Sequence, residues 1–511
     1  MTDSMTRNYN GFNNCTPKTD QKTQNQMTPT DGYDNKAMLR SELDLQGKPG
    51  VNGVTSINMD NLSKVTHNTT TPNGQQNGKP NFYDPYQHRD VKHPTSYFDT
   101  LIHLLKASLG TGILAMPSAF RNAGYIVGTL GTIIIGILCT YTIHLLVTSS
   151  YVLCVKRKVP SLTYPACAAA AFEEGPKMTR KFAPYARMIT KLFLVLYQIG
   201  SSCIYIVFIA KNLKSIGDNY LETTGPYTDD RMYMVYIIIP LILICWIRNL
   251  KLLSPFSSVA NCLSMLSFGL IFYFIFRDLP SLSSRAPVGT IKSIPLFFGT
   301  VLFAMEAIGM VLPLENEMKN PKKFGSVFGV LNGAMLPITL LYTFVGFFGY
   351  LKYGEATTGS ITLDLPAGEL LAQVVKLLLS ISIYICYALS NYVAFDIMWK
   401  SLETKMEKNE NKIWWEYALR TSIVMVTFFL AVAIPNLEHL ISLIGAFCLS
   451  TVGIALPAII NFLTFVDIYR EEGYLRLGLF VLRNLLIVAI AVFAFVIGVS
   501  TSITDIINHM K

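Results

Sequence analysis

The sequence from His103 to Pro117 reads HLLKASLGTGILAMP, an apolar stretch interrupted at its centre by the small residues SLGTG. Each Gly in a helix interior costs about 1 kcal/mol relative to Ala. Freed backbone groups at membrane depth are tolerated only inside protein or beside water. Many transporters hold small charged substrates at broken helices near the bilayer midplane. The break at Ser108 to Gly112 is therefore the first place to expect function.

The composition around this stretch is that of a multi-pass membrane protein. Of 511 residues, 51% are hydrophobic and only 15% are charged, and the polar residues are concentrated before residue 94. The net charge is +9, but the basic residues form no single run and carry no aromatic-rich motif, which argues against nucleic-acid binding.

The nine cysteines have no metal-binding spacing, and we expect neither a metal nor a cofactor other than a coupling proton. Most lie in or beside apolar stretches, where Cys is a small core residue, and the predicted external loops contain none, so no disulfide framework is expected there. The sequence also lacks a phosphate loop, a catalytic triad and a haem motif. These features argue against an ATP-driven pump and against an enzyme.

Three regions are expected along the chain. Residues 1–93 are rich in Asn, Thr, Gln, Gly and Pro and cannot bury enough surface to offset ordering, which predicts a disordered cytosolic tail. Residues 94–505 form the predicted transmembrane domain, and residues 506–511 a short external or luminal end. Residues 1–30 lack the apolar region of a signal peptide, so none is expected.

Apolar stretches of membrane-crossing length predict an all-α domain of eleven transmembrane helices. They are residues 97–119, 125–152, 188–212, 232–248, 255–276, 294–314, 325–350, 370–398, 415–434, 438–465 and 478–501. A cytosolic N-terminus places the basic connections Lys156 to Arg187, Lys319 to Lys323 and Lys400 to Arg420 inside, as the positive-inside rule favours. The plasma membrane is the expected location, with a lysosomal or endosomal membrane as the alternative.

The sixth predicted helix has peculiarities related to those of the first. It carries Glu306 between Gly299 and Gly309 and ends near Pro313. Interrupted segments five helices apart point to an inverted-repeat transporter with its site between the two halves.

An unwound backbone from Ser108 through Leu109, Gly110 and Thr111 to Gly112 would suit an amino acid. Its N–H groups stand at the start of a half-helix, where a carboxylate is favoured. Carbonyls on the other side of the break can accept from an ammonium group. The alternative is close helix packing through small residues.

His103 and Glu306 are the candidate proton-coupling residues. A histidine changes charge near neutral pH, and His103 lies about two turns before the break; the alternative is a hydrogen-bonded packing histidine. Glu306 in mid-span could accept a proton or the substrate's amine charge, or it could pair with a buried lysine such as Lys106. Phe303 and Tyr384 could close over a substrate.

Weaker candidates surround these two. They are His144, His439, Asp396 and Lys376, together with Glu315 and Glu317, which we interpret as an inner-surface charge cluster or gate.

Several stretches resemble the proton-coupled amino acid transporters of the amino acid/auxin permease group, in particular insect-type members. They are Leu101 to Lys106 followed by Gly110-Thr111-Gly112, Asn249 to Lys251, Pro295 to Thr300, Gly309 to Asn316, Met318 to Pro321, and Gly359 to Leu363. The resemblance covers nearly all of residues 95–505.

The resemblance implies two inverted five-helix halves, discontinuous helices one and six, and one extra C-terminal helix. It also implies symport of a proton with small neutral amino acids of the glycine, alanine and proline class, with His103 in the proton-coupling position. Vertebrate members carry a loop disulfide, which the Cys-free loops 213–231 and 352–368 exclude here.

Two rival functions share the same site. One is an amino-acid sensor with little net transport, which would signal to partners through the N-terminal tail. The other is a pH-gated channel or uniporter.

Overall fold

The computed structural model describes residues 83–108, 110–220, 229–248, 250–305, 307–406 and 411–510, and these residues are helical throughout, apart from loops and one isolated bridge between Thr95 and Met318. The longer helices are α4 (Tyr97–Ser108), α5 (Thr111–Ala123), α6 (Tyr125–Arg157), α7 (Tyr164–Glu174), α8 (Ala183–Gly217), α9 (Asp230–Cys245), α10 (Leu250–Phe276), α11 (Ile294–Ala304), α12 (Ile308–Glu317), α13 (Val330–Tyr353), α15 (Leu370–Met406), α16 (Lys412–Ala433), α17 (Leu437–Ile444), α18 (Leu456–Glu472) and α19 (Tyr474–Met510).

Short helical pieces connect them. They are η2 (Pro85–Gln87), η3 (Arg180–Phe182), η5 (Leu282–Ser284), η6 (Pro321–Lys323), η7 (Gly354–Ala356) and α14 (Ile361–Asp364). The segment η8 (Gly445–Ala455) joins α17 to α18 as a π-helix.

The expected number of spans is met only in part. Over the described ranges, nine helices are long and apolar enough to cross a membrane, and the bent pair α4–α5 makes a tenth when counted as one span. The predicted stretch 232–248 is α9, which is 16 residues long. At 1.5 Å per residue this helix measures about 24 Å, less than the roughly 30 Å of a hydrocarbon core, so its length alone does not qualify it.

Both predicted helix breaks are present. The axes of α4 and α5 differ by 52° across the first break, and α11 ends at Ala304 before α12 begins at Ile308. The second break does not fall at a glycine, because Gly299 lies within α11 and Gly309 within α12. Gly299 serves helix contact instead: a Cβ there would lie 2.4 Å from the Ser442 carbonyl oxygen of α17.

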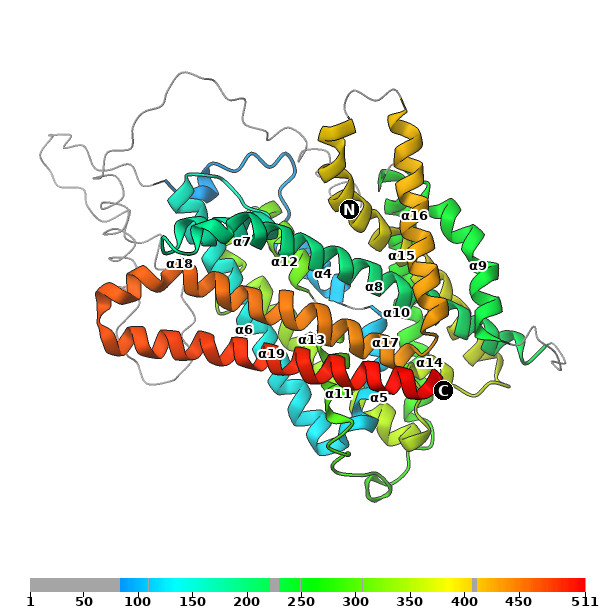
Figure 1. Ribbon diagram of the computed structural model, residues 1–511. Helices are drawn as coiled ribbons and strands as arrows, with labels where there is room; N and C mark the ends of the chain where they lie inside the picture. Colours follow the sequence, from blue (N-terminus) through cyan, green and yellow to red (C-terminus); the bar gives the residue numbers. More distant parts are fainter. Residues whose placement is uncertain are drawn as a thin grey trace, which may run out of the picture.

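The interrupted helix α17–η8–α18 packs against both α11 and the C-terminal helix. A Cβ added at Gly445 would lie 1.9 Å from the Gly299 carbonyl oxygen, so these two backbones touch through paired glycines. Helices α18 and α19, orange and red in Figure 1, lie side by side and antiparallel. The core around α5, α8, α11 and η8 is built from small and branched apolar residues, and it holds the two breaks at the centre of the bundle.

Candidate functional site

The helix-one break leaves the start of α5 without a side-chain cap. Gly110 stands at the N-cap position, and its backbone N–H donates to the Ser108 carbonyl at 2.9 Å. Because a glycine offers no capping oxygen, the first-turn N–H groups of α5 keep their donor capacity at the positive end of the helix dipole. This is an anion-binding arrangement. Leu109 lies outside the described residues.

The Ser108 carbonyl is not free to receive an ammonium group. The Tyr342 hydroxyl of α13 donates to it, and the Ser108 hydroxyl donates to the Leu104 carbonyl at 3.1 Å. Sequence reasoning missed Tyr342, since nothing in the pattern of α13 marks one tyrosine among many as facing a helix break 234 residues away.

The two helix breaks are in contact. A Cβ added at Gly112 in α5 would lie 2.5 Å from the Cα of Ala304, the last residue of α11. Phe303 is buried beside this contact, with its ring centroid 6.2 Å from that of Tyr197 in α8. The Thr111 hydroxyl is buried and has no hydrogen-bond partner among the described residues. Of the predicted site residues, Gly112 therefore lies beside the end of α11 that carries Phe303.

The predicted proton-coupling residues are only partly placed. His103 is half-buried on α4, between Asp99 one turn before it and Lys106 one turn after it. Glu306 lies outside the described residues, so its pairing stays a prediction. His144 of α6 is bonded through Nε2 to the Asn332 Oδ1 at 2.8 Å, which fits a packing histidine.

Two further candidates lie away from the breaks. The Tyr384 hydroxyl of α15 donates to the Pro240 carbonyl of α9 at 2.8 Å, so Tyr384 ties two helices together and does not close over the break. Asp396 pairs with Lys400 at 2.7 Å on the same helix.

The space at the helix-six break is small. A cavity of about 20 Å³ for water-sized molecules lies against Met305, Ala307 and Ile308, and its lining is apolar. Such a volume holds about one water, so this cavity is too small for an amino acid.

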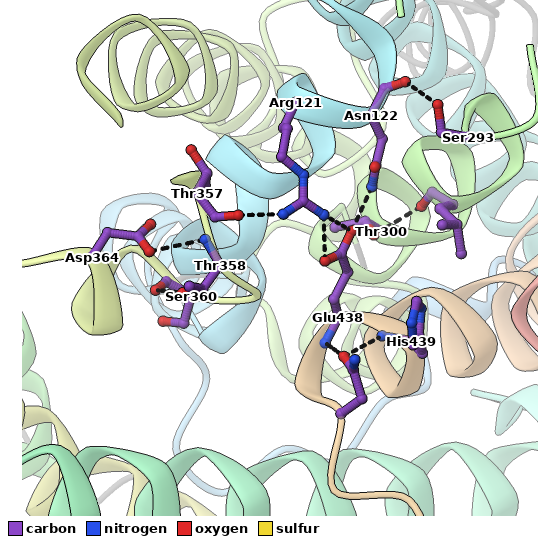
Figure 2. Close-up of polar contacts among 12 residues, drawn as sticks. Arg121, Asn122, Ser293, Thr300, Thr357, Thr358, Ser360, Asp364, Glu438 and His439 are labelled. Atoms are coloured by element: carbon purple, nitrogen blue, oxygen red, sulfur yellow. Dashed lines mark hydrogen bonds and ion pairs between the residues drawn. The ribbon is translucent and has the colours of Figure 1, made fainter. Parts of the chain in front are cut away.

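One end of the bundle is closed by ion pairing, as Figure 2 shows. Arg121 at the end of α5 directs Nη2 to both carboxylate oxygens of Glu438 in α17, each at 2.6 Å, and Nη1 to the Thr357 carbonyl. The Asn122 amide also donates to Glu438 at 2.7 Å. We name these four residues the Arg121 network; charge-assisted contacts of this kind are among the stronger hydrogen bonds.

The opposite end is closed by the segment that precedes α4. Arg89 contacts the two carboxylate oxygens of Glu315 at 3.1 and 3.0 Å, and it donates to the Glu315 and Pro160 carbonyls at 3.0 Å each. The side chains of Arg89 and Glu315 are 8% and 4% exposed. This Arg89 network joins the approach to α4 with the end of α12, and a backbone bridge from Thr95 to Glu317 and Lys319 reinforces it.

Sequence reasoning singled out Glu315 but neither arginine. The signal was present, because Arg121 and Glu438 each end an apolar stretch at what should be the same side of the membrane. Only the fold shows that these two ends meet.

The chain is similar to known proteins over most of its length. The family described as "Transmembrane amino acid transporter protein" matches residues 93–504. The chain belongs to this family. Its members are transporters, so the chain is a multi-pass amino acid transporter and not an enzyme, as the sequence predicted.

Two relatives of this transporter agree with the assignment. The Drosophila melanogaster "Proton-coupled amino acid transporter-like protein pathetic" is 40% identical over 84% of this chain and 89% of its own length. The Arabidopsis thaliana "Amino acid transporter AVT3C" is 27% identical over 81% of this chain and 92% of its own.

Solved structures also align with the transporter. The inward-facing conformation of Mhp1 covers 83% of this chain and 91% of its own, with a TM-score of 0.48 and 11% identity. A substrate-bound, outward-open Na⁺-coupled sialic acid symporter covers 92% and 96%, with a TM-score of 0.45 and 12% identity.

Proposed function

We propose that this transporter is a symporter that carries a proton together with a small neutral amino acid of the glycine, alanine and proline class into the cytosol. The observation that carries the proposal is the contact of the two helix breaks, Gly112 on Ala304, beside an uncapped helix start. The name of the Drosophila relative supports proton coupling, and the names of both relatives favour transport over sensing.

The substrate carboxylate would lie at the N–H groups of Thr111 and Gly112, since the Gly110 N–H already donates to the Ser108 carbonyl. The positive end of α5 favours that charge, and the buried Thr111 hydroxyl can donate to it. Because Ala304 packs against Gly112 and the adjacent Phe303 is buried, a small side chain would fit beside Gly112 more easily than a bulky one. These features support glycine or alanine over bulky amino acids.

Transport would proceed by opening the two networks in turn. The Arg121 network and the Arg89 network close opposite ends of the same bundle, and alternating access requires that one remains closed while the other opens. Protonation of His103, with Glu306 as a second candidate, would favour the state that accepts substrate. No cofactor beyond the coupling proton is needed.

We propose that α9 crosses the membrane as an eleventh span. Asn219, after α8, donates to the Ala367 carbonyl at 2.7 Å, and Arg277, after α10, pairs with Glu369 at 2.9 Å. Both chain positions therefore lie beside one short segment at the Arg121 end. Since α10 crosses once between them, α9 must cross in the other direction.

The proposed orientation has the N-terminus in the cytosol, so the Arg121 end faces outward. The plasma membrane is the proposed location, with a lysosomal or endosomal membrane as the alternative.

The test is uptake of labelled alanine by expressing cells at external pH 5.5 and 7.5, with a panel of other amino acids as competitors. We expect faster, concentrative uptake at pH 5.5 and competition by glycine and proline. Uptake that depends on neither pH nor membrane potential would contradict proton coupling. Binding with negligible turnover would favour the sensor, and currents far above substrate flux would favour the channel.

A further inference from the structure

A short segment from Gly354 to Asp364 carries the Arg121 network. Its Thr357 carbonyl accepts from Arg121, and the next residue, Thr358, donates its backbone N–H to Asp364 Oδ1 at 2.9 Å. Figure 2 shows Asp364 and Arg121 on either side of these two threonines. The position of Asp364 is thus tied to the position of the carbonyl that holds Arg121.

The second oxygen of Asp364 is in a different situation. Oδ2 is buried and accepts no hydrogen bond from the residues that the structure describes. A carboxylate oxygen buried without a donor is costly, and a proton on it removes the charge. Burial raises the pKa of the Asp364 carboxyl to about 6, although the hydrogen bonds from Thr358 and the positive charges of Arg121 and Lys376 act in the opposite direction.

The titratable groups that face Asp364 come from α5, α13 and α15. Arg121 is on α5, and Lys376 on α15 is fully buried with its Nζ bonded to the Ser215 hydroxyl of α8 at 2.8 Å. Tyr353 at the end of α13 also interacts with the Asp364 charge.

The lysines of α8 are directed elsewhere. Lys211 and Lys214 lie 3.6 and 3.2 Å from the carboxylate oxygens of Asp230. Neither cation therefore serves as the main partner of Asp364.

We propose that Asp364 is a proton-binding residue of the outer closure: it takes a proton from the external side, and that proton favours closing of the Arg121 network. The inference rests on the proposed proton symport and orientation. It assigns to the loop before α15 a role separate from that of His103, and it explains how loading of a proton could be required before the site closes over substrate.

The direction of the pH effect on closure follows from the difference in the Asp364 pKa between the closed and open states. When the network opens and water reaches Asp364, its pKa returns toward the ordinary value of about 3.9. The closed state, with the higher pKa, binds the proton more tightly, so acid favours closure and alkali favours opening. With pKa values of about 6 and about 3.9, a change from pH 7.5 to 5.5 favours closure about fourfold.

The experiment measures closure without relying on transport. Ser118 is buried in α5, one turn before Arg121, and a Ser118→Cys variant labelled by a membrane-impermeant maleimide reports opening. Each rate is divided by that of Ser283→Cys, an exposed position in another loop, to remove the reagent's own pH dependence. We expect relative labelling to fall about fourfold from pH 7.5 to 5.5, and to be low at both pH values with Asp364→Asn.

The matched control is Asp278→Asn, because the Asp278 side chain is 87% exposed at the same end and its positive φ of 54° suits Asn. This variant should keep the fourfold change, and Asp364→Glu should keep a pH dependence. Retention of the full change in Asp364→Asn, or labelling that does not vary with pH in the parent protein, would overturn the proposal. Either result can be obtained whether or not alanine uptake proves proton-coupled, so the two failures are distinguishable.

Discussion

Gly112 lies where the two interrupted helices touch, and the added methyl group of Gly112→Ala would meet the Ala304 backbone, which cannot rotate away. Overpacking of this kind costs about 1–3 kcal/mol, and about 1.4 kcal/mol is a tenfold change in an equilibrium. We expect alanine uptake to fall about tenfold or more while the protein still reaches the membrane.

Gly110→Ala is the matched control, since its added Cβ meets no atom within 4 Å and its φ of −112° suits any residue. Uptake by this variant should stay within about twofold of the parent, because the N–H groups of Thr111 and Gly112 are retained. Equal losses in the two variants would show that small size at the break, and not the contact with Ala304, is what matters.

A second test concerns His103. Replacing it with Ala removes the only histidine within the described part of α4. If a proton on His103 drives the change of state, His103→Ala should lose concentrative uptake and its acceleration by acid. His93→Ala, an exposed histidine ahead of α4, should behave like the parent. A His103→Ala protein that reaches the surface and still concentrates alanine at pH 5.5 would show that His103 is not needed for proton coupling.

Among the elements, the break in helix one could be predicted from sequence because consecutive small residues in an apolar stretch are costly unless the helix ends there. The break in helix six was predicted from two glycines, of which Gly299 turns out to be a packing residue and Gly309 lies inside α12. Instead, α11 ends at Ala304 and α12 begins at Ile308. The glycines thus predicted which helix is broken but not where it breaks. Glycine also occurs where two helix backbones are in close contact, so its presence alone does not mark a break.

The two closing networks could not be predicted, for a different reason. Each joins residues separated by more than 200 positions, 226 between Arg89 and Glu315 and 317 between Arg121 and Glu438. The sequence around each charged residue does not indicate which residue it pairs with. Glu315 could be recognised from the sequence as a charged residue at a helix end. Its partner Arg89 lies in the segment before α4, whose composition indicates only that the segment is polar.

The Arg89 network makes a prediction about stability. Arg89→Gln leaves the Glu315 carboxylate buried and unpaired, which costs about 3–5 kcal/mol for a buried pair. We expect the melting temperature of the purified protein to fall by several degrees.

A double variant separates this cause from general damage. Adding Glu315→Gln to Arg89→Gln removes the stranded charge and should recover most of the loss. Arg470→Gln, which breaks a pair with Asp467 whose side chains are 63% and 36% exposed, should change little. Failure of the second substitution to restore stability would mean that Arg89 acts through its carbonyl contacts alone.

For the whole molecule, the number of crossings decides on which sides of the membrane the two termini lie. An odd number places them on opposite sides, and α9 is the helix in doubt because of its 16 residues. Its lipid-facing side chains, Tyr236, Ile239 and Leu243, are large, apolar and exposed, as a membrane contact requires. A short helix is accommodated by local thinning of the bilayer and by flanking residues.

The contacts at the far end of α9 fit a crossing. Trp246 donates to the Thr421 hydroxyl at 3.0 Å, and Arg248 pairs with Glu416 at 2.7 Å, both in the first half of α16. The other end of α16 leads directly to Glu438 and the Arg121 network. Tags placed after residues 224 and 283 should therefore be accessible from the same side of intact cells, because two crossings separate them. An N-terminal tag should be protected and a C-terminal tag accessible. If the tags at 224 and 283 reported opposite sides, α9 would not cross, the chain would have ten spans, and both termini would share one side.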